Sequence, residues 1–94
     1  MQDIMEPLLV EKESIANFSF KNETNLNQSP ELLKKLKDAT GLGNLHKVKF
    51  CIDFHSDSGP KSVQTTIWAT GNKFICLKGG LWIPIAKITN IRHL

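Results

Sequence analysis

The sequence predicts an α+β fold that is mainly β: a short helix followed by a five-stranded antiparallel barrel of the SH3-like or Sm-like type. Three observations lead to this prediction. Apolar residues recur at helical spacing between residues 29 and 41, and they alternate with polar residues from residue 46 onward. The alternating segments are short and separated by turn residues. A closed barrel also avoids the two exposed edges that a small open sheet would leave.

The length of the chain predicts a single domain. Its 94 residues, 40% hydrophobic and 22% charged, can bury a modest core and have an ordinary globular composition. We divide them into an N-terminal arm (1–28), a helix (29–41) and a barrel (46–92). No apolar run approaches the roughly 20 residues of a membrane helix. Because Asp3 and Glu6 stand where an export signal is basic, we expect a cytoplasmic protein that does not contact membranes.

The helix is predicted from its start signals and its apolar spacing. Ser29 can cap the free backbone N–H groups, and Pro30 and Glu31 suit the first turn. Gly41 is expected to end the helix in a left-handed cap. The apolar residues at helical spacing are Leu32, Leu33, Leu36 and Ala39. Because this helix is short and amphipathic, it must lie on an apolar surface.

Two groups of apolar residues in the arm could form structure. A short helix would place Met5, Leu8 and Leu9 on one side. The second group could form an extra strand or an extended segment that packs on the domain: Ile15, Phe18 and Phe20.

Alternation with a period of two predicts the strands. It runs from Val48 to Phe54 and again from Val63 to Ala69, whereas Phe74–Leu77 is apolar on both faces, as a central strand would be. Gly79-Gly80 can take positive φ at both positions of a hairpin turn. The fourth predicted strand follows this turn and runs from Leu81 to Pro84, where the proline ends it. A 3₁₀ turn from Ile85 to Ile88 then leads to the last strand, which runs to Arg92.

One stretch of the predicted barrel resembles known proteins. It contains the hairpin Leu77-Lys78-Gly79-Gly80 and then Ile83-Pro84-Ile85, as do small uncharacterised bacterial proteins with a C-terminal SH3-like or Sm-like barrel. With its closing run Lys87-Ile88-Thr89, the layout is also similar to the Rof family, small Sm-like inhibitors of the termination factor Rho. The resemblance covers residues 29–92 and implies a bacterial barrel protein, and it supplies no catalytic residue. Rof proteins are strongly acidic whereas this barrel is basic, so Rho inhibition does not transfer.

Cysteine and histidine do not form a recognisable catalytic or metal-binding pattern. Cys51, Asp53 and His55 share one face of a predicted strand, but they are about 7 Å apart, too strung out to chelate one ion. Cys51 and Cys76 lie in predicted strands without a Cys-x-x-Cys pair; we expect a reduced pair, although a disulfide between neighbouring strands is geometrically open. We therefore expect a protein that is not an enzyme, with no catalytic residue, no metal ion and no cofactor.

Charge is distributed unevenly along the chain. Residues 1–46 carry five lysines and seven acids, a balance of −2, whereas residues 47–94 carry six lysines, one arginine and two acids, a balance of +5. The basic half suggests a polyanion or an acidic protein surface as partner, although solvated lysines also protect sheet edges. The candidate binding surface comprises five lysines and both tryptophans: Lys47, Lys49, Trp68, Lys73, Lys78, Trp82 and Lys87.

The two tryptophans decide between two interpretations. If Trp68 and Trp82 lie outside the barrel, they form stacking platforms beside lysines, as in binders of single-stranded nucleic acid. If the helix covers them, they need no function, and this is the prediction we favour. We expect a non-catalytic, regulatory small-barrel protein that binds a protein partner. This partner could be a second copy of the same chain, bound through unpaired strand edges. The alternative is a single-stranded RNA- or DNA-binding protein.

Overall fold

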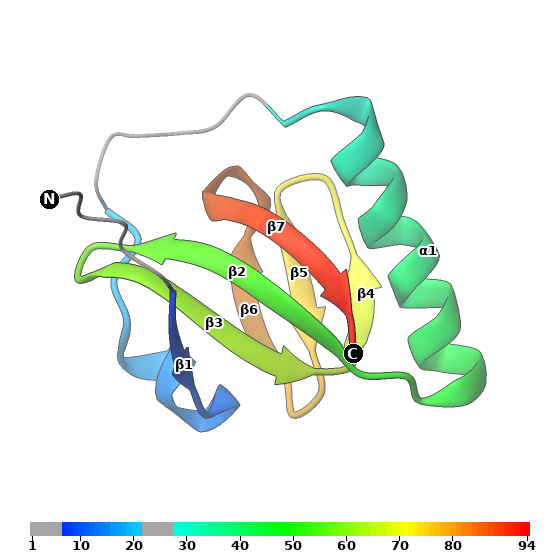
Figure 1. Ribbon diagram of the computed structural model, residues 1–94, viewed down its shortest axis with the longest axis horizontal. Coiled ribbons are helices and arrows are strands. Elements are labelled where there is room, and N and C mark those ends of the chain that lie inside the picture. The colour runs from blue at the N-terminus through cyan, green and yellow to red at the C-terminus, as the bar shows by residue number, and fades with distance from the viewer. Residues whose placement is uncertain (1–6, 22–27) are drawn as a thin grey trace, which may run out of the picture.

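The computed structural model describes residues 7–21 and 28–94, and their strands form two sheets beside one long helix (Figure 1). The four-stranded sheet has the order β1 (Leu8–Val10), β3 (Gly59–Thr65), β2 (Phe50–Ser56) and β7 (Ile88–His93). The three-stranded sheet has the order β4 (Ile67–Thr70), β5 (Phe74–Leu77) and β6 (Leu81–Pro84). The fold is therefore α+β and mainly β, as predicted, whereas no closed barrel is detected among the described residues.

The strands follow one another closely along the chain. β2 pairs antiparallel with β3 and with β7, and β5 pairs antiparallel with β4 and β6. Only Thr66 separates β3 from β4, where the sequence predicted one uninterrupted strand. The predicted glycine turn joins β5 to β6, with φ of 94° at Gly79 and 82° at Gly80. The predicted 3₁₀ turn is η2 (Ile85–Lys87), which links β6 to β7.

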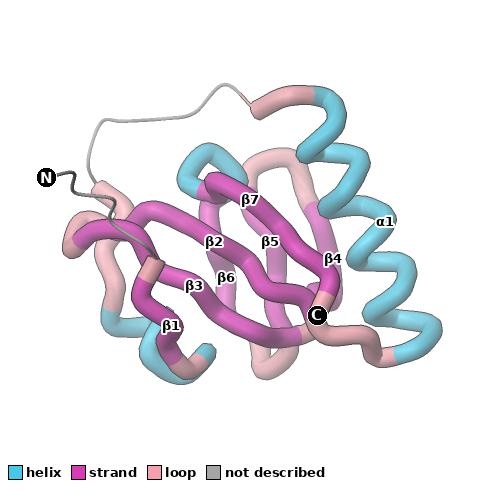
Figure 2. The backbone as a smooth tube through the Cα atoms, viewed as in Figure 1, coloured by secondary structure: helices cyan, strands magenta, loops and turns pink. Residues whose placement is uncertain are grey.

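The core lies between the two sheets. Ile52 and Phe54 of β2 and Ile75 and Leu77 of β5 are all fully buried. Each side of this two-layer arrangement is covered by a helical segment: α1 (Pro30–His46) contacts β4 and β7, and η1 (Lys12–Asn17) contacts β3 and β6. In Figure 2 these two segments lie at opposite sides of the strands. Both elements therefore close the gap between the edges of the two sheets.

The helix begins as predicted but ends later. Ser29 Oγ accepts a hydrogen bond from the Leu32 N–H at 3.1 Å, which satisfies a free donor of the first turn. The predicted end at Gly41 is wrong, because the helix continues to His46 and the left-handed cap is Lys47, with φ of 56°. Residues 42–46, expected as a connector and a strand start, are therefore helical, and β2 begins only at Phe50.

A different constraint explains the second glycine of this helix. A Cβ on Gly43 would lie 2.7 Å from the Ile67 carbonyl oxygen and 2.8 Å from Thr66 Cγ2. Gly43 is buried, so the missing side chain lets the helix backbone approach β4 directly. Glycine is present here for packing and not for termination.

The N-terminal arm also differs from its prediction. Leu8 and Leu9, expected in a short helix, belong to β1, which pairs parallel with β3; Met5 lies outside the described residues. η1 buries Ile15, and the following segment packs on the core as the extended alternative predicted. There, Phe18 and Phe20 lie with ring centroids 6.2 and 5.9 Å from that of Phe54.

The contact at Gly43 makes a testable prediction about stability. Gly43→Ala should lower the free energy of unfolding by about 1–3 kcal/mol, because the new methyl group meets a backbone carbonyl that cannot move cheaply. Gly41→Ala is the matched control: open space surrounds its Cβ position, so it should raise stability by about 0.5–1 kcal/mol. Urea denaturation of the two variants measures both effects. Equal effects of the two substitutions would contradict the packing explanation.

Candidate functional site

The outer face of the three-stranded sheet carries large exposed rings. In β5, Ile75 and Leu77 point into the core, so Phe74 and Cys76 face outward. Trp82 of β6 lies opposite Cys76 in the strand pairing. The Phe74 and Trp82 rings are edge to face, with centroids 6.4 Å apart and an interplanar angle of 88°. They are 45% and 54% exposed, respectively, so this pair is held in place but open to solvent.

Trp68 lies on the outer face of the same sheet because of a β-bulge in β4. Ile67 pairs with Leu77 and Ala69 with Cys76, so Trp68 is the extra residue of a β-bulge. Its side chain is 47% exposed. We call Trp68, Phe74 and Trp82 the aromatic face.

The prediction that α1 covers the tryptophans is wrong. The helix inserts Leu36 and Ala39, which are buried, and it contacts β4 and β7. One contact with a tryptophan is polar: Asn44 Nδ2 donates a hydrogen bond to the Trp68 carbonyl at 3.3 Å. The buried side chains of the helix therefore fill the gap between the two sheets, and among the described residues both tryptophan side chains stay exposed.

Phe74 was missing from the predicted surface. The strand Phe74–Leu77 is apolar on both faces, so alternation alone could not show which residues point outward. The one sequence signal near this position was Pro84, because a proline marks the end of a strand. In the structure Pro84 pairs with Phe74, so Phe74 lies at the end of its own strand, near the boundary of the sheet.

Exposed lysines border the aromatic face at two ends. Lys73 immediately precedes Phe74, and the Lys78 backbone N–H donates to the Thr66 carbonyl at 2.9 Å, next to the start of β4. Lys49 and Lys78 line the same pocket, of about 250 Å³, together with Glu11 and Glu13. The structure thus brings together Lys49, Lys78 and the β4 end of the sheet. Lys47 is exposed at the C-terminal cap of α1.

Lys87 does not belong to this exposed surface. Its residue is only 3% exposed, so its inclusion in an open lysine surface is wrong. The reason is its position in η2, where Ile85 and Lys87 are both buried. The period-two pattern of the neighbouring strands could not predict this, because a 3₁₀ turn directs its side chains differently.

Carboxylates are absent from the part of the sequence that forms the aromatic face. Residues 58–94 include five basic residues and no aspartate or glutamate. The charged side chains of the segment 66–85 are therefore Lys73 and Lys78 alone. The segment that forms the face is therefore positively charged, and two acids from outside it, Glu11 and Glu13, lie at its Lys78 end.

A second cluster of polar side chains lies on the outer face of the four-stranded sheet. Arg92 Nη2 donates to Asp53 Oδ1 at 2.9 Å and lies 3.1 Å from Cys51 Sγ, which is itself 2.9 Å from Ser62 Oγ. The Asp53 carboxylate raises the pKa of Arg92 by accepting this hydrogen bond. Among the described residues, the hydrogen-bond partners of Cys51 include no histidine that could act as its base. The contacts satisfy partly buried polar groups.

In the described part of the chain, neither a group of metal ligands nor a membrane-spanning helix is found. No group of three or more His, Cys, Asp and Glu side chains in the described residues could hold a metal ion. No helix among residues 7–21 and 28–94 has the length and apolar character needed to cross a membrane.

Both cysteines are free, and the fold explains why they do not pair. Cys51 alternates with the core residues Phe50 and Ile52, and Cys76 alternates with Ile75 and Leu77. Each thiol therefore lies on the outer side of its own sheet, with the core between them. A disulfide between neighbouring strands, left open by the sequence, is excluded by this placement.

Compared with protein-family models, curated proteins and solved structures, the chain gave no match. The placement of its side chains must therefore carry any functional argument.

The two thiols should differ in reactivity. In the native protein Cys76, which is partly exposed, should react promptly with a thiol reagent, whereas Cys51, 5% exposed, should react only as the sheet opens. Titration with an aromatic disulfide reagent should count one fast thiol per native chain and two in urea. The Cys76→Ser variant should lose the fast phase. A fast phase that survives in this variant would contradict the assignment.

Proposed function

We propose that this chain is a non-catalytic binding protein that holds single-stranded nucleic acid on its aromatic face. The observation that carries the proposal is the exposure of Trp68, Phe74 and Trp82 on one sheet whose own charged residues, in the segment 66–85, are lysines. Bases stack on exposed rings, and lysines neutralise the phosphates between them. Because neither interaction reads base edges, binding should depend little on sequence.

The proposal includes an SH3-like or Sm-like layout of the strands. Two features support it: β3 runs into β4 with one residue between them, and β7 returns to pair with β2 after the 3₁₀ turn η2. In such a layout the two sheets would be halves of one strongly bent sheet. The aromatic face would then be part of the outer surface of a small barrel, where other small barrels bind single strands.

The arrangement of the rings limits the mode of binding. Phe74 and Trp82 are already in edge-to-face contact, so little side-chain entropy is lost when a base stacks on them. Trp68 lies on β4, two strands away from Trp82 on β6. A strand of nucleic acid would therefore cross β4, β5 and β6 to reach both tryptophans. Lys73 and Lys78 flank β5 at its two ends, so they lie on either side of this path where it crosses the middle strand.

The first test concerns the rings. Titrating single-stranded RNA should quench the tryptophan fluorescence to saturation, and Trp82→Ala should weaken binding roughly 5- to 150-fold, because one stacked base contributes about 1–3 kcal/mol. Leu45→Ala is the matched control, since Leu45 is 79% exposed but lies on α1. Unchanged affinity of Trp82→Ala, or no quenching even at low salt, would reject the proposal and favour a protein partner on this face.

The second test concerns charge. Lys73→Glu/Lys78→Glu and Lys35→Glu/Lys37→Glu each change the net charge from +3 to −1, but only the first pair borders the aromatic face. With about three phosphates neutralised in the native protein, RNA affinity should fall roughly 10- to 20-fold between 50 and 200 mM salt. The first variant should bind weakly and with a shallower salt dependence, whereas the second should keep most of its affinity. Equal losses would show that only net charge matters.

A further inference from the structure

A groove runs along the free edge of β7, beneath α1. It consists of two neighbouring pockets, which we call its halves. The first, about 330 Å³, has a mainly apolar lining from α1, β2 and β7 that also includes charged side chains of the helix, and the second, about 410 Å³, lies towards the start of α1. Lys35 lines both halves and marks their junction. The groove therefore follows α1 from Glu31 to Leu42 and β7 from Ile88 to His93.

The strand that forms one wall still has a side without a neighbouring strand. β7 is at the edge of the four-stranded sheet and, in the part of the chain that the structure describes, pairs with β2 alone. Such an edge offers backbone donors and acceptors to an added strand. One acceptor is already used from outside the sheet: Gln28 Nε2 donates to the Ile88 carbonyl at 2.7 Å. This contact occupies the edge at the start of β7, and α1 contacts the strand from the side of the helix.

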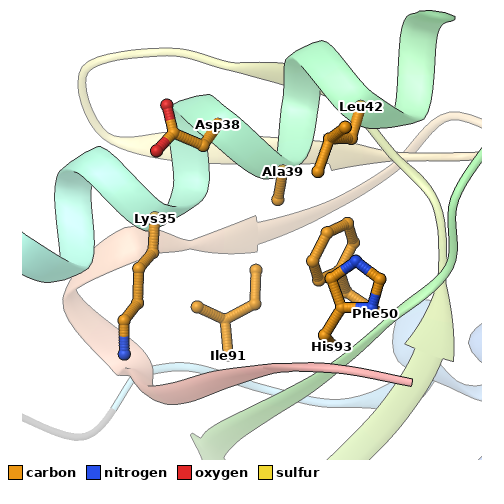
Figure 3. Close-up of a pocket in the computed structure, with 7 residues that line it drawn as sticks. All are labelled: Lys35, Asp38, Ala39, Leu42, Phe50, Ile91 and His93. Carbon is orange, nitrogen blue, oxygen red and sulfur yellow. The ribbon is translucent and has the colours of Figure 1, made fainter. Parts of the chain in front are cut away.

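The apolar half of the groove has the size of a side-chain pocket. Ala39 and Leu42 point into it from α1, and Phe50, Ile91 and His93 line its opposite wall (Figure 3). The His93 ring packs edge-on against Phe50, with centroids 4.8 Å apart, so this wall is fixed. A leucine-sized or phenylalanine-sized side chain would bury apolar area here without rearrangement.

The charge of Lys35, at the junction of the two halves, favours a ligand with a negatively charged side chain. Figure 3 shows Lys35 reaching from α1 towards β7, whereas the Asp38 carboxylate points away from the groove. Asp38 is paired with Lys34 at 2.8 Å, and this carboxylate raises the pKa of Lys34. No ion pair involves Lys35 within residues 7–21 and 28–94. Among the described residues that line the groove, Lys35 therefore stands without an ion pair next to the apolar pocket, while the acids of the lining, Glu31 and Asp38, belong to the helix wall.

We propose that this groove binds an extended peptide of a partner protein, which adds a strand to β7. Main-chain hydrogen bonds to the edge supply affinity, and the two walls supply specificity. Alternate residues of a strand point to the same side about 7 Å apart. The recognised peptide thus carries an apolar residue for the pocket of Ala39, Leu42 and Ile91, and an aspartate or glutamate two residues away for Lys35.

The experiment is selection of a displayed library of random peptides on the full chain. Enriched peptides should share an apolar residue and an acidic residue two positions apart. With a synthesised enriched peptide, Lys35→Glu should weaken binding about five- to tenfold, whereas Lys37→Glu, two residues along the same helix, should not. In amide NMR spectra the peptide should shift and protect residues of β7.

Three results would overturn the proposal: no enrichment, equal binding by both charge variants, or amide shifts confined to the aromatic face. Methylating alternate backbone nitrogens of the peptide provides a further criterion. It should abolish binding if a strand is added and leave binding unchanged if only side chains dock. Because Lys35 is exposed, its substitution tests the groove without removing a core residue.

Discussion

The close contact between α1 and β4 is the constraint on which the other features of this fold depend. Gly43 has no side chain to separate the helix backbone from the Ile67 carbonyl, so the helix lies directly against the edge of the three-stranded sheet. From there Leu36 and Ala39 fill the gap between β4 and β7, as Ile15 of η1 fills the gap on the opposite side. The two sheets share one core because both of these gaps are filled with apolar side chains.

The same contact explains why two surfaces stay open. A helix that packs on the sheet edges cannot also cover the outer face of β4, β5 and β6, so the tryptophans remain exposed. Since α1 is held mainly at β4, its contact with β7 is lighter, and the groove with Lys35 lies between them. The position of one helix therefore determines both the aromatic face and the groove.

Local signals in the sequence were sufficient for local structure. Ser29 and Pro30 predicted the helix start, Gly79-Gly80 the hairpin, and the residues after Pro84 the 3₁₀ turn. The failures depend on contacts between distant segments. Gly41 was predicted to end the helix, but the helix continues past it, and the packing role of Gly43 is visible only when Ile67 is placed beside it. Leu8–Val10 likewise becomes a strand only by pairing with β3. Whether the tryptophans are exposed likewise depends on the position of the helix, which its own amphipathic pattern does not specify.

Electrostatics separates the two surfaces and favours a different ligand at each. Around the aromatic face, the segment 66–85 contributes two lysines and no acids, which is the charge that the proposed binding of phosphates requires. The groove borders a helix that carries Glu31 and Asp38 as well as lysines, and its floor is apolar. A polyanion there would lose hydration without enough cations to compensate, whereas a peptide with a single carboxylate needs only Lys35. One small domain can thus offer a stacking surface to a nucleic acid strand and a sheet edge to a peptide without competition between them.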